Sequence, residues 1–346
     1  MQNDAQFPDH FPLLFHIALD LFRRPSPSGQ EDLVRAYTVA HLEQHGFTVS
    51  VDPAGNVLAA RGAPEPDEGY PLLSFHMDCI SSETSFLTEY DASTLAALVF
   101  GSASSAETAQ YRTQRRRAAK PPLRELDTLH VTRGYLHSKG AFVLGGDDKC
   151  GGAIALTLAA TTKMPLKILA SVEEEIGCVG VEQVDPLFFK DVAYALVLDR
   201  RGANHLVVSI DGHPLCQGTF AGAMMRAAAA TGLLVYAVEG APSDARTLSQ
   251  HMLNVVNLSV GYYQPHTVEE RVSLADLWRS YQWVKEALRS LPRQSDRAQP
   301  FAQRVAVEEA LLCPRCQRLT LAPEDLPEDI WRFLCHCREA ALAPVK

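Results

Sequence analysis

The sequence has no long hydrophobic run and no strong excess of positive charge. No apolar stretch approaches the roughly 18 residues that a membrane-spanning helix needs, and the N-terminal sequence MQNDAQFPDHF lacks the basic start and apolar block of a signal peptide. The formal net charge is −9, which does not suit a nucleic-acid-binding surface. We therefore expect a cytoplasmic protein whose partners include neither a membrane nor a nucleic acid.

The eight cysteines do not have the arrangement of a disulfide framework. Four are scattered through the chain, and four crowd its C-terminal part. In a reducing compartment, clustered thiols are more often metal ligands than disulfides, and scattered thiols are more often small buried apolar groups. The scattered cysteines are Cys79, Cys150, Cys178 and Cys216.

The composition is that of a globular protein, and the order of its apolar segments is that of the α/β class. Of 346 residues, 47% are hydrophobic and 21% are charged, which allows one large domain with appendages or several smaller ones. Apolar periodicity predicts helices over 10–22 and 32–46, and short apolar strands then alternate with helix-like segments. This alternation is typical of a mainly parallel, mixed sheet with helices on both faces. The expected strands are 71–75, 141–144, 165–171, 193–199, 206–210, 233–238 and 255–260, and the later helices are 151–162, 221–232 and 274–291.

The domain organisation follows from breaks in this alternation. We expect a catalytic domain over 1–292, with a polar, alanine-rich and helix-leaning insertion at about 79–135. The turn-rich sequence at 293–304 reads as a linker. The remaining 305–346 form a cysteine-bearing tail.

Polar side chains that can bind metal stand at the ends of the expected strands. They are His76 and Asp78, Asp147 and Asp148, Glu173, Glu174 and Glu175, Asp199, and the later His266. One carboxylate at a strand end usually caps the next helix. Several that converge on one sheet edge repel each other unless cations compensate their charge. Histidines and carboxylates together suit zinc or another divalent first-row metal, so the sequence predicts a metal site at this edge.

Eight short motifs, taken in order, resemble the landmarks of a known enzyme class. They are PSPSGQE, DPAGNVL, SFHMD, GGDDKCGG, EEEIG, LVLD, GAPSDA and YYQPHTVEE. Over about residues 10–290 the chain resembles the co-catalytic, dinuclear zinc metallopeptidases of the M20, M28 and M42 families, which include peptidase T. The resemblance implies a zinc-peptidase-like α/β fold and two divalent metal ions, with zinc expected and cobalt or manganese as alternatives.

The resemblance also implies a role for individual residues. It makes Glu174 the general base and gives Asp78 the task of orienting the imidazole of His76. It makes Asp147 the carboxylate that bridges the metals, and the peptide between Asp147 and Asp148 is often cis in relatives. The implied metal ligands are His76, Asp147, Glu175, Asp199 and His266. Asp148 is the alternative for the bridge, and His213 and His251 are the rivals of His266.

The function implied by the resemblance is metal-dependent hydrolysis of peptide bonds. Too few residues separate Asp199 from His266 to hold the lid domain that M20 members insert there, which favours an M28- or M42-like plan. Extra acids at Asp148 and Glu173 favour a protonated amino group, so we expect an aminopeptidase acting on peptides, with a homo-oligomer as an option. The alternatives are a deacylase or other amidohydrolase acting on a non-peptide amide, and an inactive binding homologue.

The C-terminal cysteines have nearly the spacing of a zinc ribbon. Cys313 and Cys316 form a C-x2-C pair, and Cys335 and Cys337 follow as C-x-C. His336 could replace one of the thiolates. The expectation is one structural zinc ion, and the alternative is a helical tail with incidental thiols.

Overall fold

The computed structural model describes residues 10–80, 129–140 and 142–293, together with two short strands at 311–312 and 319–320. All four tail cysteines and most of the expected insertion lie outside the described residues. Within those residues, no helix is both long enough and apolar enough to cross a membrane. The two short strands, β14 (Leu311–Leu312) and β15 (Leu319–Thr320), pair with each other.

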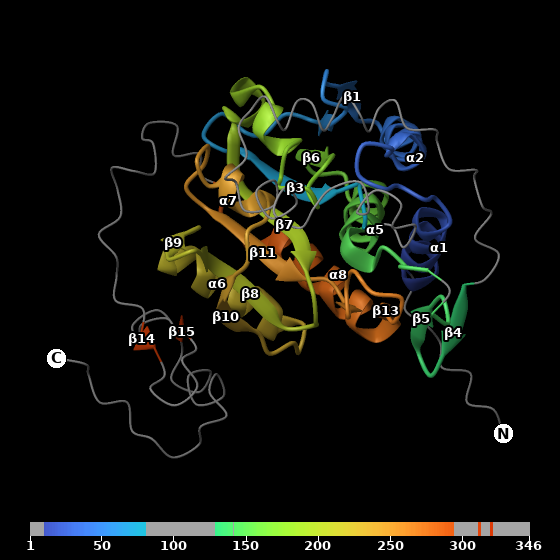
Figure 1. The fold of residues 1–346 in the computed structure, drawn as a ribbon. Coiled ribbons are helices and arrows are strands. Elements are labelled where there is room, and N and C mark those ends of the chain that lie inside the picture. Colours follow the sequence, from blue (N-terminus) through green and yellow to red (C-terminus); the bar gives the residue numbers. More distant parts are fainter. Residues whose placement is uncertain (1–9, 81–128, 141, 294–310, 313–318, 321–346) are drawn as a thin grey trace, which may run out of the picture.

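The core of the protein is a nine-stranded mixed sheet (Figure 1). Its strands are β1 (Thr48–Val51), β2 (Val57–Arg61), β3 (Tyr70–His76), β6 (Leu166–Ser171), β7 (Val192–Arg200), β8 (His205–Ile210), β9 (His213–Pro214), β10 (Tyr236–Gly240) and β11 (Val255–Ser259). They run in the order β1-β2-β6-β3-β7-β11-β8-β10, and β9 pairs with β8. The four central strands β6, β3, β7 and β11 are parallel, whereas β1, β2 and β9 pair antiparallel. The expected mixed sheet is therefore confirmed.

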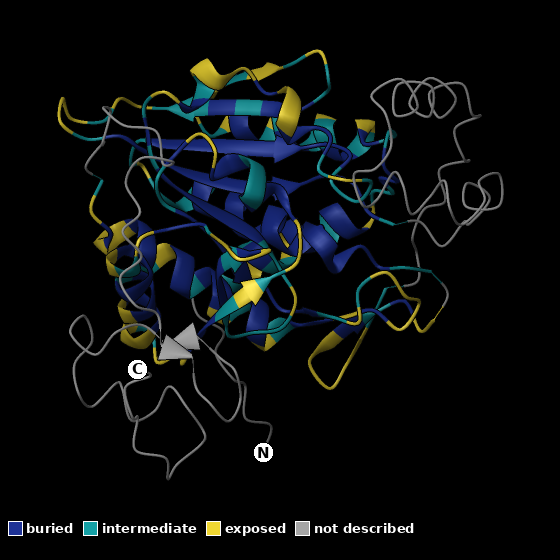
Figure 2. Cartoon of the chain, turned by 60° about the vertical axis from the view of Figure 1, so that its left-hand side comes forward, coloured by how far each residue is buried: buried dark blue, intermediate teal, exposed yellow. Residues whose placement is uncertain are grey.

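Helices cover both faces of this sheet. They are α1 (Phe11–Phe22), α2 (Asp32–Gln44), α5 (Gly146–Thr161), α6 (Gly218–Ala230), α7 (Asp244–Leu248) and α8 (Leu274–Ser290), with 3-10 turns η2 (Val181–Gln183) and η3 (Pro186–Phe189). Alternate side chains of β3 serve the two faces, since Leu73 and Phe75 join the cluster under the long helices while Leu72 joins the cluster under α7. Figure 2 shows the central strands of the sheet and the packed faces of the helices as buried.

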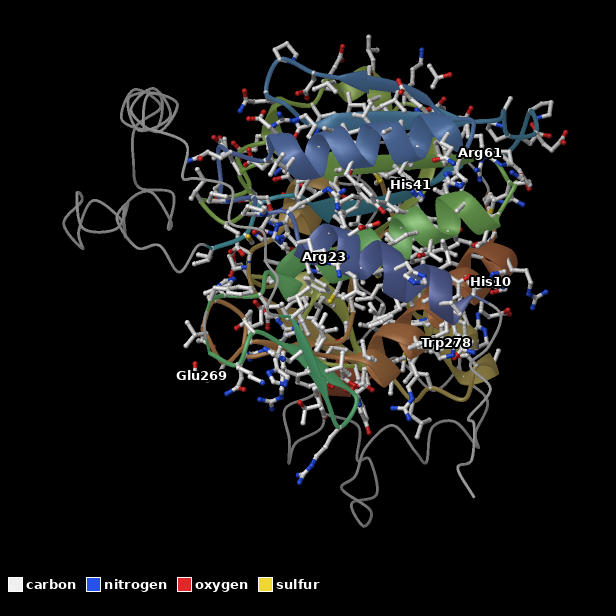
Figure 3. All side chains as sticks on the ribbon, turned by 90° about the vertical axis from the view of Figure 1, so that its right-hand side faces the viewer. His10, Arg23, His41, Arg61, Glu269 and Trp278 are labelled. Carbon is white, nitrogen blue, oxygen red and sulfur yellow. The ribbon has the colours of Figure 1, made fainter. Side chains whose placement is uncertain are left out.

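Helix α5 lies close against the sheet because its first turns carry glycines. A Cβ atom at Gly151 would lie 2.1 Å from the Leu198 carbonyl oxygen of β7. The far half of α5 is held by polar contacts. Arg61 donates to the Ala159 carbonyl, and His41 Nε2 lies 3.0 Å from the Leu156 carbonyl oxygen (Figure 3). This fixes α5 and, with it, the acidic residues at its start.

A second, four-stranded sheet stands beside the start of α5. It runs in the order β12-β13-β5-β4, from β12 (Tyr262–Tyr263), β13 (Arg271–Ser273), β5 (Tyr135–His137) and β4 (His130–Thr132). The expectation of a helix-leaning insertion is wrong for its described end, because β4 and β5 form a hairpin. Its two turn residues, Arg133 and Gly134, both have positive φ angles of 51° and 80°, which is the conformation of a tight type I′ turn.

The expected strand at 141–144 is also wrong for its described residues. Residues 142–144 form no strand. Leu144 is 1% exposed and Phe142 packs against the core, so the apolar pattern reflects burial of an irregular segment. These residues also cannot pair with β3, because β6 and β7 already occupy both of its edges.

Candidate metal centre

The central parallel strands bring the metal-binding side chains to one edge of the sheet. His76 is the last residue of β3, and Asp199 is the last but one of β7. Glu174 and Glu175 follow the end of β6, and His266 lies in the turn after β12. Because the carboxyl ends of parallel strands meet at the same edge, residues far apart in the sequence become neighbours here.

His76 lies at the centre of the first group of candidate ligands. Its Nε2 atom is 3.1 Å from Asp147 Oδ1 and 3.6 Å from Asp199 Oδ1. The other ring nitrogen, Nδ1, is 3.0 Å from the carbonyl oxygen of Asp78 and 3.5 Å from its carboxylate. Asp78 therefore fixes the imidazole through Nδ1, and Nε2 points toward the carboxylates of Asp147 and Asp199.

His266 belongs to the second group, which shares Asp147 with the first. His266 Nε2 is 3.0 Å from Glu175 Oε2 and 3.3 Å from Asp147 Oδ2. The two oxygens of Asp147 thus face different groups, each made of one histidine and two carboxylates. Glu175 Oε1 is buried and has no hydrogen-bond partner among the described residues. This donor set fits two divalent first-row cations that share one carboxylate.

The electrostatics of the centre favour cations. Burial raises the pKa of Glu175 and of Asp199 to about 7, and the charge of Asp147 adds to both shifts. Contacts with Asp147 and Glu175 raise the pKa of His266 to about 10. Burial alone would lower the pKa of His76, but its carboxylate neighbours raise it well above the ordinary value. Raised pKa values at Glu175, Asp199 and His266 mean that a divalent cation binding to these candidate ligands would displace protons.

Asp147 and Asp148 are joined by a cis peptide bond, as the resemblance implied, but the two side chains have different surroundings. Asp148 is fully buried, and it accepts hydrogen bonds from the backbone N–H groups of His76 and Gly151. Burial raises its pKa well above the usual range. Asp148 lies in neither ligand group, so the geometry favours Asp147 over Asp148 as the shared carboxylate.

Asp78 connects His76 to the acidic turn after β6. Besides holding the imidazole, its two carboxylate oxygens accept hydrogen bonds from the backbone N–H of Glu174, at 2.9 Å, and of Glu175, at 3.2 Å. Glu174 Oε2 lies 3.9 Å from His76 Nε2. Burial raises the pKa of Glu174 well above the ordinary value, and the charges of Asp199 and Glu175 raise it further.

Sequence reasoning assigned no role to Glu270, the last residue of the YYQPHTVEE motif. It is fully buried and accepts hydrogen bonds from the N–H of Gly145, at 2.7 Å, and of Asp147, at 3.1 Å. Burial raises its pKa to about 7. Glu270 therefore fixes the backbone that carries Asp147. No local pattern distinguishes Glu270 from the neighbouring Glu269, which is the same residue type and is exposed in the structure.

Two other motif residues also proved to be structural supports of the acidic turn. Glu31, from PSPSGQE, is 2% exposed and accepts from the N–H of Gly29 and of Glu173. Asn56, from DPAGNVL, accepts from the N–H of Val172 and donates to the Gly180 carbonyl. These contacts explain why both motifs carry a polar side chain at a buried position.

The rival histidines lie elsewhere. His213 is exposed in β9, and His251 stacks on Phe189 at a ring-centroid distance of 4.9 Å. Among the described residues, neither joins a candidate ligand group. Tyr262, by contrast, donates to Asp199 Oδ1 at 3.3 Å and so contacts the first group directly.

No family model and no curated protein matches this sequence, but solved structures do. The aminopeptidase PepT of Bacillus cereus superposes with a TM-score of 0.62 at 15% identity, over 81% of this chain and 98% of that one. A tripeptidase of Staphylococcus aureus gives 0.60 at 14% identity, over 80% and 97%. The TET1 peptidase of Pyrococcus horikoshii, which can assemble into a tetrahedron or a large octahedral shell, gives 0.55 at 15% identity, over 80% and 99%.

These similarities define the class of fold. The chain has the mixed α/β fold of solved aminopeptidases and tripeptidases, and it spans nearly the full length of those structures. The zinc-peptidase-like fold expected from the sequence is therefore confirmed.

Proposed function

We propose that the protein is a dinuclear metallopeptidase that removes residues from the N-terminus of peptides. The observation that carries this proposal is the position of Asp147, whose Oδ1 lies 3.1 Å from His76 Nε2 and whose Oδ2 lies 3.3 Å from His266 Nε2. One carboxylate between two histidine-containing ligand groups suits a pair of cations. The proposed ligands are His76, Asp147, Glu175, Asp199 and His266.

Two divalent ions, which we propose to be zinc, supply Lewis acidity that lowers the pKa of water and polarises a scissile carbonyl. Glu174 is the proposed general base. It accepts a proton from the attacking water and returns it to the departing amine, and burial, which raises its pKa, strengthens it as a base. Asp78 keeps Glu174 in place through the backbone N–H of that residue and orients His76 at the same time.

The proposed cleavage from the N-terminus loses one of the two residues that support it in the sequence. Asp148 is fully buried and holds two backbone N–H groups, so it is not available to bind a substrate amine. One support is the number of carboxylates at the centre, whose negative charge favours a protonated amino group. The other is that solved structures of the same fold are aminopeptidases. No structural observation favours the deacylase or the binding homologue.

Several wider features belong to this proposal. We place the catalytic domain at 1–292 and the activity in the cytoplasm, where the thiols of the described cysteines, all free, would stay reduced. A homo-oligomer is part of the proposal, since the TET1 peptidase with this fold assembles into shells. Light scattering of the purified protein measures this directly.

The experiment that tests the function uses matched peptides. Metal-reconstituted protein is given the same peptide with a free N-terminus, with an acetylated N-terminus, and with an amidated C-terminus. We expect cleavage from the N-terminus of the free peptide, little cleavage of the acetylated one, and no effect of amidation. Faster cleavage of the acetylated peptide would overturn the proposal in favour of a deacylase.

A further inference from the structure

Glu174 has a second set of neighbours, on the side away from His76. Cys178 donates its thiol proton to Glu174 Oε1 across 3.5 Å, whereas Glu174 Oε2 is the oxygen nearest His76. Asp244, the first residue of α7, completes this set. One ligand atom from each of Glu174, Cys178 and Asp244 lies within 4.8 Å of the other two.

Asp244 has an unsatisfied oxygen in this set. The side chain is 2% exposed, and Ser171 donates its hydroxyl to Oδ2. Oδ1 is buried and has no hydrogen-bond partner in the described part of the chain. The Cys178 thiol also lies near Asp244, but it has one proton, and it donates that proton to Glu174 Oε1. A buried carboxylate oxygen without a donor is costly, and a cation would remove that cost.

The donor chemistry differs from that of the catalytic centre. The two ligand groups around Asp147 contain nitrogen and oxygen donors, whereas this set adds a sulfur donor, and soft divalent ions such as zinc and cadmium bind thiolates well. Burial and the charge of Glu174 raise the pKa of the Cys178 thiol well above its usual value. The thiol therefore keeps its proton until a cation binds, and the cation has to displace that proton to gain the thiolate as a ligand. Cys178 is partly exposed, which gives an ion access.

We propose that Glu174, Cys178 and Asp244 form a third cation site, which takes zinc in excess of the catalytic pair and inhibits the enzyme. A cation held by Glu174 Oε1 withdraws electron density from the carboxylate that must accept a proton. The site itself rests on the contacts above. Its inhibitory effect rests additionally on the proposed role of Glu174 as general base.

The site is tested by cadmium binding to the full-length protein. Cadmium bound to a thiolate absorbs in the ultraviolet by charge transfer, whereas cadmium on the histidine and carboxylate ligands does not. We expect Cys178→Ser to lose one equivalent of this absorption. Cys216→Ser is the control, because Cys216 is also a free thiol but lies in none of the ligand groups of the described residues. Any absorption from cadmium on the tail cysteines is the same in all variants, so the difference in absorption between wild type and Cys178→Ser reports on Cys178.

A second variant keeps the thiol and alters the carboxylate. Asp244→Asn should weaken the cadmium affinity measured at this absorption by at least about tenfold, which is the loss typical of removing even a support of a metal ligand. If Cys178→Ser leaves the absorption unchanged, or Asp244→Asn leaves the affinity unchanged, the third site does not exist.

Inhibition is measured separately, with the rate of each variant normalised to its own value before excess zinc is added. Excess zinc should inhibit the wild-type protein at a concentration about tenfold lower than it inhibits Cys178→Ser. Equal inhibition of the two would overturn the inhibitory role. Absence of any peptidase activity would refute the proposed function instead, and the cadmium absorption would still decide whether the site exists.

Discussion

Asp147 is the side chain on which both proposed metal positions depend. Its Oδ1 faces His76 and its Oδ2 faces His266. We therefore expect Asp147→Ala to lose both catalytic metal ions. His266→Ala should lose only the ion in the group of His266, because the group of His76, Asp147 and Asp199 remains intact. Metal content after dialysis, measured by atomic absorption, tests this. His251→Ala is the control for a histidine outside both groups. Two metals retained in Asp147→Ala would contradict the shared position.

Glu31 gives a prediction about pH. Burial, followed by the charge of Asp78, raises its pKa from 4.5 to about 7 in the folded protein. The folded state therefore holds the proton more tightly than the unfolded state, and Glu31 lowers stability as pH rises from about 4.5 to 7. In Glu31→Gln the amide oxygen can still accept from Gly29 and Glu173, and the buried charge is absent.

We expect Glu31→Gln to stabilise the metal-free protein at pH 8 by about 1–3 kcal/mol and to have little effect near pH 4.5. Urea denaturation at the two pH values measures this. Glu182→Gln, at an exposed position, controls for the loss of one negative charge. An equal gain at both pH values would show that the charge of Glu31 is not the cause.

At the scale of elements, the turn between β12 and β13 supports the start of α5. Glu270 holds the N–H groups of Gly145 and Asp147. Glu270→Ala leaves these groups without their acceptor and frees the backbone that carries Asp147. We expect metal affinity to fall about 10- to 100-fold, as it does when other supports of metal ligands are removed.

The matched control is Glu269→Ala, which removes the same side chain from the adjacent, exposed position (Figure 3). Its metal affinity, measured by competition with a chromophoric chelator, should equal that of the wild type. If both variants bind metal as the wild type does, Glu270 has no part in holding the centre.

The elements differ in how far the sequence predicted them. The buried central strands were predictable because each is a short apolar run, and the ligands that follow them were found because parallel strands end at one edge. The hairpin of β4 and β5 was missed, since its signal is one Arg133-Gly134 turn beside a long polar stretch. Glu270 was missed because its partners lie 123 and 125 residues away, and no local pattern encodes such a contact.

For the whole molecule, the tail is the part whose role can be separated from the catalytic centre. No candidate ligand of the described residues lies beyond His266. We expect deletion of 305–346 to remove one zinc ion, bound by Cys313, Cys316, Cys335 and Cys337, while peptide hydrolysis continues. Zinc content and turnover of the shortened protein measure the two effects. Unchanged zinc content would rule out the zinc ribbon.

The most direct test of the central claim is the Glu174→Gln variant, with metal content and peptide turnover measured on the same full-length sample. Glu174 is the proposed base and not a proposed ligand of the catalytic pair, which His76, Asp147, Glu175, Asp199 and His266 hold, so the variant should keep both catalytic metal ions. Because general-base catalysis contributes about 10²–10⁴-fold, turnover of an unblocked peptide should fall by that factor. Turnover close to that of the wild type, with both metals bound, would contradict the claim.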